Sequence, residues 1–221
     1  MRRLAIASLL LGAVLAVASP ASAMVLGLNW GVGQSPAHIT YNGHNLNVWA
    51  GKMEAYLGGS LGNPLPPVDG QFIGYVYCVD LDHMISLPTE YQVTESTTAT
   101  INNGSRIAWL YKNYSPATTS SNMAAALQLA IWEVLVDNGD GFNTGSFRYT
   151  GGLSSITGSQ AQSMIAASVN KSESSARVLR AVGPYGQTMI APPVPEPTSL
   201  ALLGLGLGFA VAGMVARRRS S

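Results

Sequence analysis

Two uncharged apolar segments lie at the ends of the 221-residue chain and limit its folded part to the residues between them. The first, residues 4–17, follows Arg2 and Arg3 and precedes a run of small residues that includes Ala21 and Ala23. This order is typical of a secretory signal peptide. We therefore predict a signal peptide over residues 1–23, removed by signal peptidase after Ala23, with an uncleaved anchor helix as the alternative.

The second apolar segment, residues 198–216, contains no charged side chain. At about 1.5 Å per residue a helix of this length just spans a hydrocarbon core of about 30 Å. A basic cluster follows at once and is expected to stay cytoplasmic as a short tail, residues 217–221, which places the preceding domain outside. The alternative is the core helix of a soluble domain, but the segment is apolar on all sides. The cluster consists of Arg217, Arg218 and Arg219.

The region between these ends is predicted to form one extracytoplasmic domain, residues 24–190, followed by a spacer, residues 191–197, that holds four prolines. Between residues 24 and 197 there are seven basic and eleven acidic side chains, a net charge of −4. A domain without a basic face lacks the electrostatic footprint that nucleic-acid binding requires. We therefore expect no nucleic-acid partner.

The local patterns predict an α+β domain, with an antiparallel β-sandwich or barrel-like core and a buried helix packed against it. The clearest helix covers residues 122–137, because it is apolar nearly all round, has serines before it and ends at Asn138-Gly139. A weaker helix is expected over 159–170. Strands are expected over residues 37–41, 46–51, 71–81, 91–101 and, broken by Gly183-Pro184, 177–190.

The single cysteine, Cys78, needs an explanation in a domain sent to an oxidising compartment, since it has no partner for an intramolecular disulfide. Alternation along its strand puts it on one side with Phe72, Gly74 and Val76. Gln128 is equally unusual, because it lies on a packed face of the predicted helix. A buried carboxamide without partners costs about 1–3 kcal/mol, so this one requires hydrogen bonds or a chemical role.

The C-terminal end has three parts in a fixed order: Val194 with Pro195-Glu196-Pro197, then the apolar segment, then the terminal arginines. In this order it closely resembles the PEP-CTERM sorting tail of Gram-negative bacteria. The resemblance implies recognition of Pro195, Glu196 and Pro197 by exosortase, a membrane protease-transpeptidase that removes the tail and passes the protein to the cell surface or its exopolysaccharide. An ordinary stalk and anchor is the alternative.

The exported part carries Tyr77-Cys78-Val79-Asp80-Leu81 and, fifty residues after the cysteine, Gln128 within Leu127-Gln128-Leu129-Ala130-Ile131-Trp132. These segments resemble the thioester, or TQXA, domain of bacterial surface adhesins, whose Cys sulfur is bonded to a Gln side-chain carbonyl. The resemblance implies that Cys78 and Gln128 form this bond. Leu127 departs from the family, which most often has Thr at this position.

The chemistry of the two residues is consistent with that reading. A thiolate of Cys78 held against the Gln128 carboxamide can expel ammonia, and the resulting acyl group can then be attacked by an amine or hydroxyl of a covalent partner. Tyr75, Tyr77 and Trp132 are expected to limit the entry of water, although packing in the core is their default role. An inert buried thiol is the alternative for Cys78.

We therefore expect an exported protein, transiently membrane-anchored and then held at the cell surface or in the extracellular matrix, which adheres covalently and is not a turnover enzyme. A non-covalent structural protein of biofilm or exopolysaccharide is the second hypothesis. A secreted cysteine hydrolase is the third, but no histidine lies in a nucleophile context. The loop at residues 137–141 resembles a calcium loop in composition and is better explained as a turn. No cofactor or metal is expected.

Overall fold

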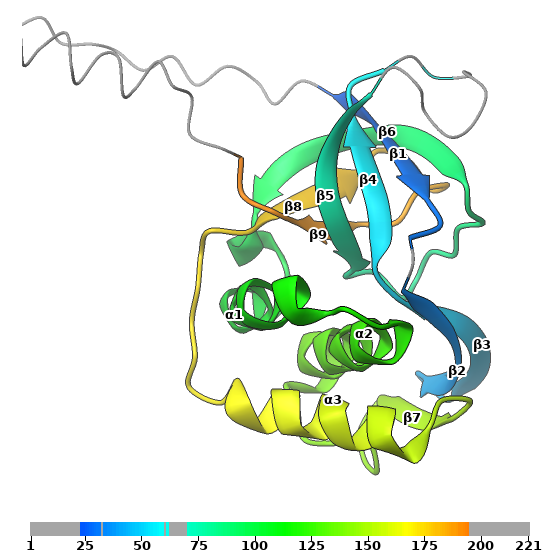
Figure 1. Ribbon diagram of the computed structural model, residues 1–221, viewed down its shortest axis with the longest axis vertical. Helices are drawn as coiled ribbons and strands as arrows, with labels where there is room; N and C mark the ends of the chain where they lie inside the picture. The colour runs from blue at the N-terminus through cyan, green and yellow to red at the C-terminus, as the bar shows by residue number, and fades with distance from the viewer. Residues whose placement is uncertain (1–22, 32, 60, 62–69, 195–221) are drawn as a thin grey trace, which may run out of the picture.

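The computed structural model describes residues 23–31, 33–59, 61 and 70–194, which form a closed six-stranded antiparallel barrel, a three-stranded sheet and three helices (Figure 1). The α+β prediction is therefore confirmed, with a barrel and not a sandwich as its core. The barrel strands, in spatial order, are β1 (Met24–Asn29), β4 (Met53–Leu57), β5 (Gln71–Cys78), β9 (Met189–Ala191), β8 (Arg177–Ala181) and β6 (Thr89–Thr97).

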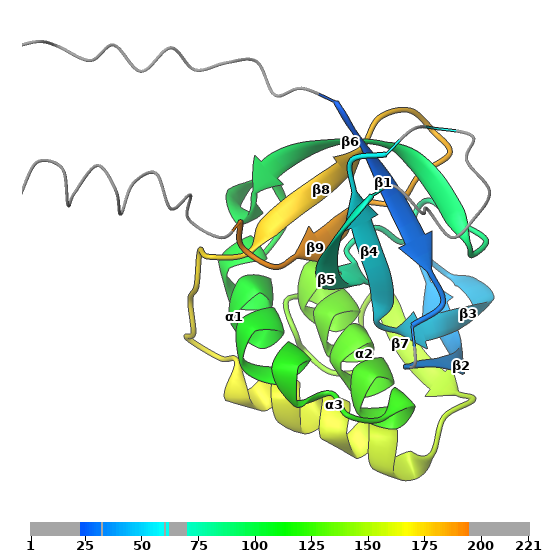
Figure 2. The same cartoon turned by 45° about the horizontal axis from the view of Figure 1, so that its top comes forward.

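The small sheet and the helices lie together beside one end of the barrel, as the two views in Figures 1 and 2 show. The sheet has the order β3 (His44–Gly51), β2 (Gln34–Tyr41), β7 (Phe147–Gly151). The helices are α1 (Gly104–Tyr114), α2 (Ser121–Asp137) and α3 (Ser155–Ala167), with short 3-10 turns at Thr98–Thr100 and Ser115–Ala117. Helix α2 is central, since it contacts both other helices, all three strands of the small sheet and the end of β5.

Helix α2 forms where the sequence predicts it, because both of its ends carry local signals. The side chain of Ser120 accepts a hydrogen bond from the Met123 N–H at 3.3 Å, which satisfies one of the free amides of the first turn. Asn138 ends the helix in the left-handed conformation at φ 59°, as the Asn138-Gly139 pair predicts. All residues from 124 to 134 are buried, and each large apolar side chain among them contributes about 1.5–3 kcal/mol.

The strand predictions are confirmed in position but need correction at their ends. Residues 37–41 and 46–51 lie in β2 and β3, which pair through a tight turn at Asn42 and Gly43, both at positive φ. Strand β5 ends at Cys78 and β6 at Thr97, each short of the prediction. The final strand is split into β8 and β9, and the second predicted helix, 159–170, runs instead from Ser155 to Ala167, with Ser154 as its N-cap.

The predicted faces of β5 also need one correction. The pairing of β5 with β4 shifts register between Ala55 and Tyr56, which is the mark of a β-bulge. A bulge interrupts strict alternation. The ring of Phe72, expected on the side of Cys78, packs instead against the ring of Tyr75, with 6.0 Å between centroids.

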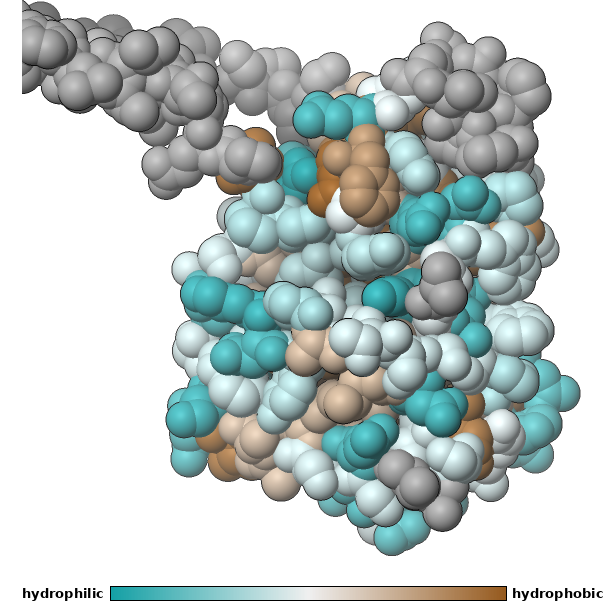
Figure 3. Space-filling model, viewed as in Figure 1, coloured by the Kyte–Doolittle hydropathy of each residue, from teal (hydrophilic) through white to brown (hydrophobic). Residues whose placement is uncertain are grey.

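Hydrophilic and neutral side chains predominate on the face shown in Figure 3, with weakly apolar side chains between them over the lower part. The buried apolar side chains of α1 and α2 face the core. Within the described residues, no helix is long and apolar enough to cross a bilayer. The predicted sorting motif at residues 195–197, the predicted membrane helix at 198–216 and its basic tail lie outside the described part, as does Ala21, whereas Ala23 is its first residue and is exposed.

Candidate functional site

The structure brings Cys78 and Gln128 together through the backbone of the cysteine. The Cys78 N–H donates to Gln128 Oε1 at 2.9 Å, and Gln128 Nε2 donates to the Cys78 carbonyl at 2.8 Å. Both residues are buried: 3% of the surface of Cys78 and 1% of the surface of Gln128 is exposed. The carboxamide of α2 thus bonds both main-chain groups of the last residue of β5, and its carbon is held beside this residue.

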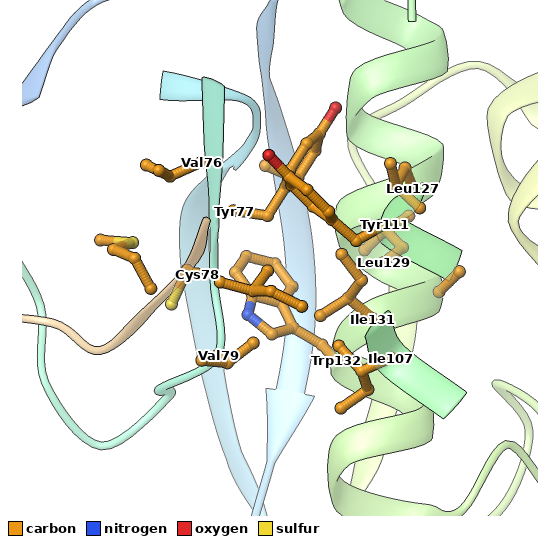
Figure 4. Packing of buried hydrophobic residues seen from close by; sticks show 14 of the residues in the cluster. Val76, Tyr77, Cys78, Val79, Ile107, Tyr111, Leu127, Leu129, Ile131 and Trp132 are labelled. Carbon is orange, nitrogen blue, oxygen red and sulfur yellow. The ribbon is translucent and has the colours of Figure 1, made fainter. Parts of the chain in front are cut away.

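The Cys78 sulfur lies in an apolar environment with three polar neighbours. Its S–H donates to the Asp80 carbonyl at 2.8 Å, and the Asp80 N–H donates back to the sulfur at 3.3 Å. The Trp132 N–H makes no hydrogen bond of good geometry, but Figure 4 shows its ring nitrogen turned toward Cys78. Burial raises the pKa of the thiol to about 12, although the hydrogen bonds with Asp80 and Trp132 act to lower it. The thiol is therefore protonated near neutral pH.

The hydrogen bonds of Gln128 are arranged as an acyl-transfer reaction needs them. The N–H of Cys78 points at the carboxamide oxygen, on which negative charge develops when a nucleophile adds to the carbon. The carbonyl of Cys78 binds the amide nitrogen, which is the group that leaves. A buried donor fixed before the reaction stabilises an oxyanion without reorganisation. The site can therefore support attack at the Gln128 carbonyl carbon.

A pocket of about 510 Å³ opens onto the pair, and both Cys78 and Gln128 line it. This volume is within the range of small-molecule sites in proteins. Its walls come from segments far apart in the sequence, namely the start of β2, the end of β3, the loop after β5 and helix α2. The exposed indoles of Trp30 and Trp49 stand at it, together with Met84 and the buried Trp132. An external molecule can therefore reach the pair.

Asp80 holds the loop that supplies the sulfur's partners. Its Oδ1 accepts from the N–H groups of Asp82 and His83, its Oδ2 accepts from the Thr188 N–H, and both oxygens contact His83 Nδ1 at 3.0–3.1 Å. The Gln187 side chain donates to the carbonyl of Asp80 at 3.3 Å. These positioning roles were missed from the sequence, although Asp80 stands in the cysteine motif; its place two residues after Cys78 is the signal that was available.

Of the three aromatic residues expected to limit water entry, only Trp132 lines the pocket. Tyr77 is fully buried in the core, where its hydroxyl bonds Thr118 Oγ1 at 3.2 Å and its ring contacts Tyr111, as Figure 4 shows. The ring of Tyr75 packs against Phe72 and under the ammonium of Lys52. The default packing role therefore describes the two tyrosines, and of the three residues Trp132 alone stands where it can shield the pair.

The loop after α2 is the turn that the sequence predicts. Asp137 Oδ2 accepts from the Phe147 N–H at 2.6 Å, and Glu133 Oε1 accepts from the Gly141 N–H at 2.9 Å, so both carboxylates brace the turn. Carboxylate oxygens of Glu133, Asp137 and Asp140 lie within 4.8 Å of one another. Glu133 is fully buried. Burial, together with the nearby Asp140 and Asp137, raises the pKa of its carboxyl to about 7, although the hydrogen bond from the Gly141 N–H acts to lower it.

This carboxyl predicts a loss of stability with rising pH. The folded state binds the Glu133 proton more tightly than the unfolded state, so the contribution is present at acid pH and is lost as pH rises through about 7. As the pH rises from 5.5 to 8.5, the free energy of unfolding of Glu133→Gln is expected to increase by about 1–3 kcal/mol relative to that of wild type. Thermal unfolding at both pH values measures this. As a control, Glu173→Gln should show no alkaline gain, because the hydrogen bond with Lys112 lowers the pKa of that carboxylate. An equal effect of Glu133→Gln at the two pH values would contradict the prediction.

The barrel strand and the buried helix, with a cysteine and a glutamine in contact between them, define a domain that can hold an internal thioester. The family model described as the thioester domain matches residues 75–176, a range that includes Cys78 and Gln128. The model of the PEP-CTERM protein-sorting motif matches residues 193–219. The C-terminal end of the chain therefore matches the PEP-CTERM sorting motif, and its folded domain resembles the bacterial thioester domain. No curated protein and no solved structure matches the chain.

Proposed function

We propose that this surface protein forms an internal thioester between Cys78 Sγ and the side-chain carbonyl carbon of Gln128, and that it uses this bond to attach covalently to a nucleophile on another surface or polymer. The observation that carries the proposal is the pair of hydrogen bonds, at 2.9 and 2.8 Å, that hold the Gln128 carboxamide against the main chain of Cys78. The match to the thioester domain supports it.

Formation of the bond needs no outside reagent. The Cys78 sulfur adds to the Gln128 carbon while the Cys78 N–H stabilises the oxyanion, the C–N bond breaks, and ammonia leaves with the proton of the thiol. Because burial keeps the thiol protonated, the rate depends on enforced proximity and not on a standing thiolate. The S–H bond to the Asp80 carbonyl is given up in the same step.

The second step is attack by an amine or hydroxyl that enters through the pocket. The new bond forms to the Gln128 carbon, the C–S bond breaks, and the nucleophile's proton passes to the Cys78 sulfur. The partner stays attached to Gln128 as an amide or ester. Each molecule reacts once, so in this proposal the protein is an adhesin and not a turnover enzyme.

Export and sorting supply the location for this reaction. In the proposal, exosortase recognises Pro195, Glu196 and Pro197 while the segment 198–216 holds the chain in the membrane and Arg217, Arg218 and Arg219 stay on the cytoplasmic side. The match to the sorting motif over residues 193–219 supports this order of events. Removal of the tail then leaves the domain at the cell surface, with its pocket open to the outside.

The intact mass of the purified protein tests the thioester. The wild-type protein is expected to be lighter than its processed sequence by one ammonia and to gain one methylamine on incubation with that amine. The variants Cys78→Ala and Gln128→Ala should have the mass of their sequences and should not react. In parallel, a thiol reagent applied to unfolded wild type should label Cys78 only after the methylamine treatment.

A wild-type mass equal to the sequence, with full labelling of Cys78 before any amine is added, would remove the covalent proposal. The domain would then be a non-covalent surface or matrix module, which is the second hypothesis from the sequence. A cysteine hydrolase predicts a third pattern, in which repeated turnover is lost in Cys78→Ala but kept in Gln128→Ala.

A further inference from the structure

Among the described residues, no charged side chain lines the pocket at the Cys78 and Gln128 pair. Its polar lining residues are Gln34, Asn47, Ser86, Gln128 and Gln187, and all others that line it are apolar or aromatic. An ammonium group that enters such a pocket loses its hydration without gaining a carboxylate partner, which is costly. The lining therefore favours an uncharged ligand over a protonated lysine side chain.

Two exposed tryptophans line the pocket on the outer side. Trp30 is 46% exposed and Trp49 is 58% exposed, and their rings meet edge to face with 5.7 Å between centroids. The indole N–H of Trp30 donates to the main-chain carbonyl of Leu87 at 3.0 Å, although the two residues are 57 positions apart in the sequence. Large aromatic surface left in water beside a concave site is typical of binding surfaces. Since the Trp30 ring is fixed by this hydrogen bond, the surface is formed before any ligand arrives.

Gln34, which lines the pocket, has a buried oxygen without a partner: its Oε1 makes no hydrogen bond within the described chain. A buried polar atom left unpaired costs about 1–3 kcal/mol, so this acceptor is a favourable position for a ligand that brings a hydroxyl group, which donates to it.

We propose that this pocket binds a neutral sugar residue of a polysaccharide, with its C–H faces stacked on Trp30 and Trp49, and presents one of its hydroxyl groups to the Gln128 acyl carbon. This inference rests on the proposed thioester and narrows its partner to a class. The pocket volume of about 510 Å³ accommodates a ligand of one or two sugar rings.

The transfer is balanced within the site. An O–C bond forms between the sugar and the Gln128 carbon, the C–S bond to Cys78 breaks, and the hydroxyl proton passes to the departing sulfur. The product is an ester and a free Cys78 thiol. The apolar surroundings that favour a protonated thiol favour this proton transfer, and the Cys78 N–H again holds the oxyanion.

The test measures covalent adducts of the purified full-length protein by intact mass. The probes are neutral hexasaccharides of glucose, mannose and N-acetylglucosamine, with methylamine as the reference and Nα-acetyl-lysine amide as the model for a protein amine. At least one sugar is expected to add its whole mass to the thioester form and to be released by hydroxylamine, as an ester is. Trp49→Ala should lower the rate of that addition at least tenfold and change the methylamine rate less than twofold.

Tyr185→Ala is the matched control, because Tyr185 is 88% exposed and does not line the pocket; it should leave both rates unchanged. Three results overturn the saccharide proposal while the thioester stands: addition of the lysine probe with none of the sugars, equal slowing of sugar and methylamine by Trp49→Ala, or a sugar rate that Trp49→Ala does not alter. If methylamine itself gives no adduct, the proposed function fails, and the sugar transfer fails with it.

Discussion

Replacement of Gln128 by alanine in a protein that already carries Cys78→Ala is expected to lower the free energy of unfolding by about 3–5 kcal/mol. The Cys78→Ala background removes any thioester, so the change reports only what the carboxamide does as a hydrogen-bonding group. It leaves the N–H and carbonyl of residue 78 buried without partners, at about 1–3 kcal/mol each, and adds a small cavity. Urea unfolding of the single and double variants gives the difference.

Gln162→Ala, made in the same Cys78→Ala background, controls for the loss of a glutamine from a helix, since Gln162 is exposed on α3. It should cost less than about 0.5 kcal/mol, as surface substitutions usually do. A loss below 1 kcal/mol for Gln128→Ala would contradict the structure, because it would mean that the main chain of residue 78 does not depend on this side chain. The role of Gln128 would then be chemical alone.

The parts of the fold that the sequence predicts are those fixed by nearby residues. Helix α2 has its serine cap, its uninterrupted apolar surface and its Asn138-Gly139 end within one stretch of chain. The hairpin of β2 and β3 has its Asn42-Gly43 turn between two strand-like runs. In these elements the local preference and the tertiary structure agree, so a single sequence is sufficient.

Helix α1 was not predicted, because its supports are distant in sequence. It begins at Gly104 after Asn103 in the left-handed conformation, with no side-chain cap and no acidic residue in its first turn. Its start is held by the Asn103 side chain, which donates to the Val134 carbonyl at 2.7 Å, and by Arg106, which donates to the Ile165 carbonyl at 2.9 Å. These contacts exist only once α2 and α3 are packed beside it.

The site shows the same division. Cys78 and Gln128 could be paired from the sequence, because a lone thiol in an exported domain and a glutamine on a buried helix each require an explanation, and the family resemblance joins them. The hydrogen bonds of Gln128 go to main-chain atoms, which leave no mark in the sequence. The pocket could not be predicted either, since Trp30, Trp49 and Leu87 meet only through the closure of the barrel on the small sheet.

Gly51→Ala, at the last residue of β3, is expected to cost at least 3 kcal/mol more than Gly43→Ala, in the turn just before this strand. Gly43 has φ 83° with open space around it, so alanine there meets only the left-handed strain of about 1–2 kcal/mol. Gly51 has φ 146°, and a Cβ added to it would lie 1.9 Å from the main-chain oxygen of Gly33. Because that neighbour is backbone, the clash is relieved only if the β2–β3 pairing opens where Gln34 faces Gly51.

Opening at that point has a consequence for the site, since β3 and β2 carry Trp49 and Gln34 into the pocket. Urea unfolding of both glycine variants gives the difference in stability, and the rate of sugar addition to the folded fraction reports the position of Trp49 in the pocket. Gly43→Ala serves as the strain-only control and should add the sugar at the wild-type rate. Equal costs for the two variants would mean that the strand junction beside Gly33 adjusts freely. The β2–β3 pairing would then not hold Trp49 and Gln34 in fixed positions at the pocket.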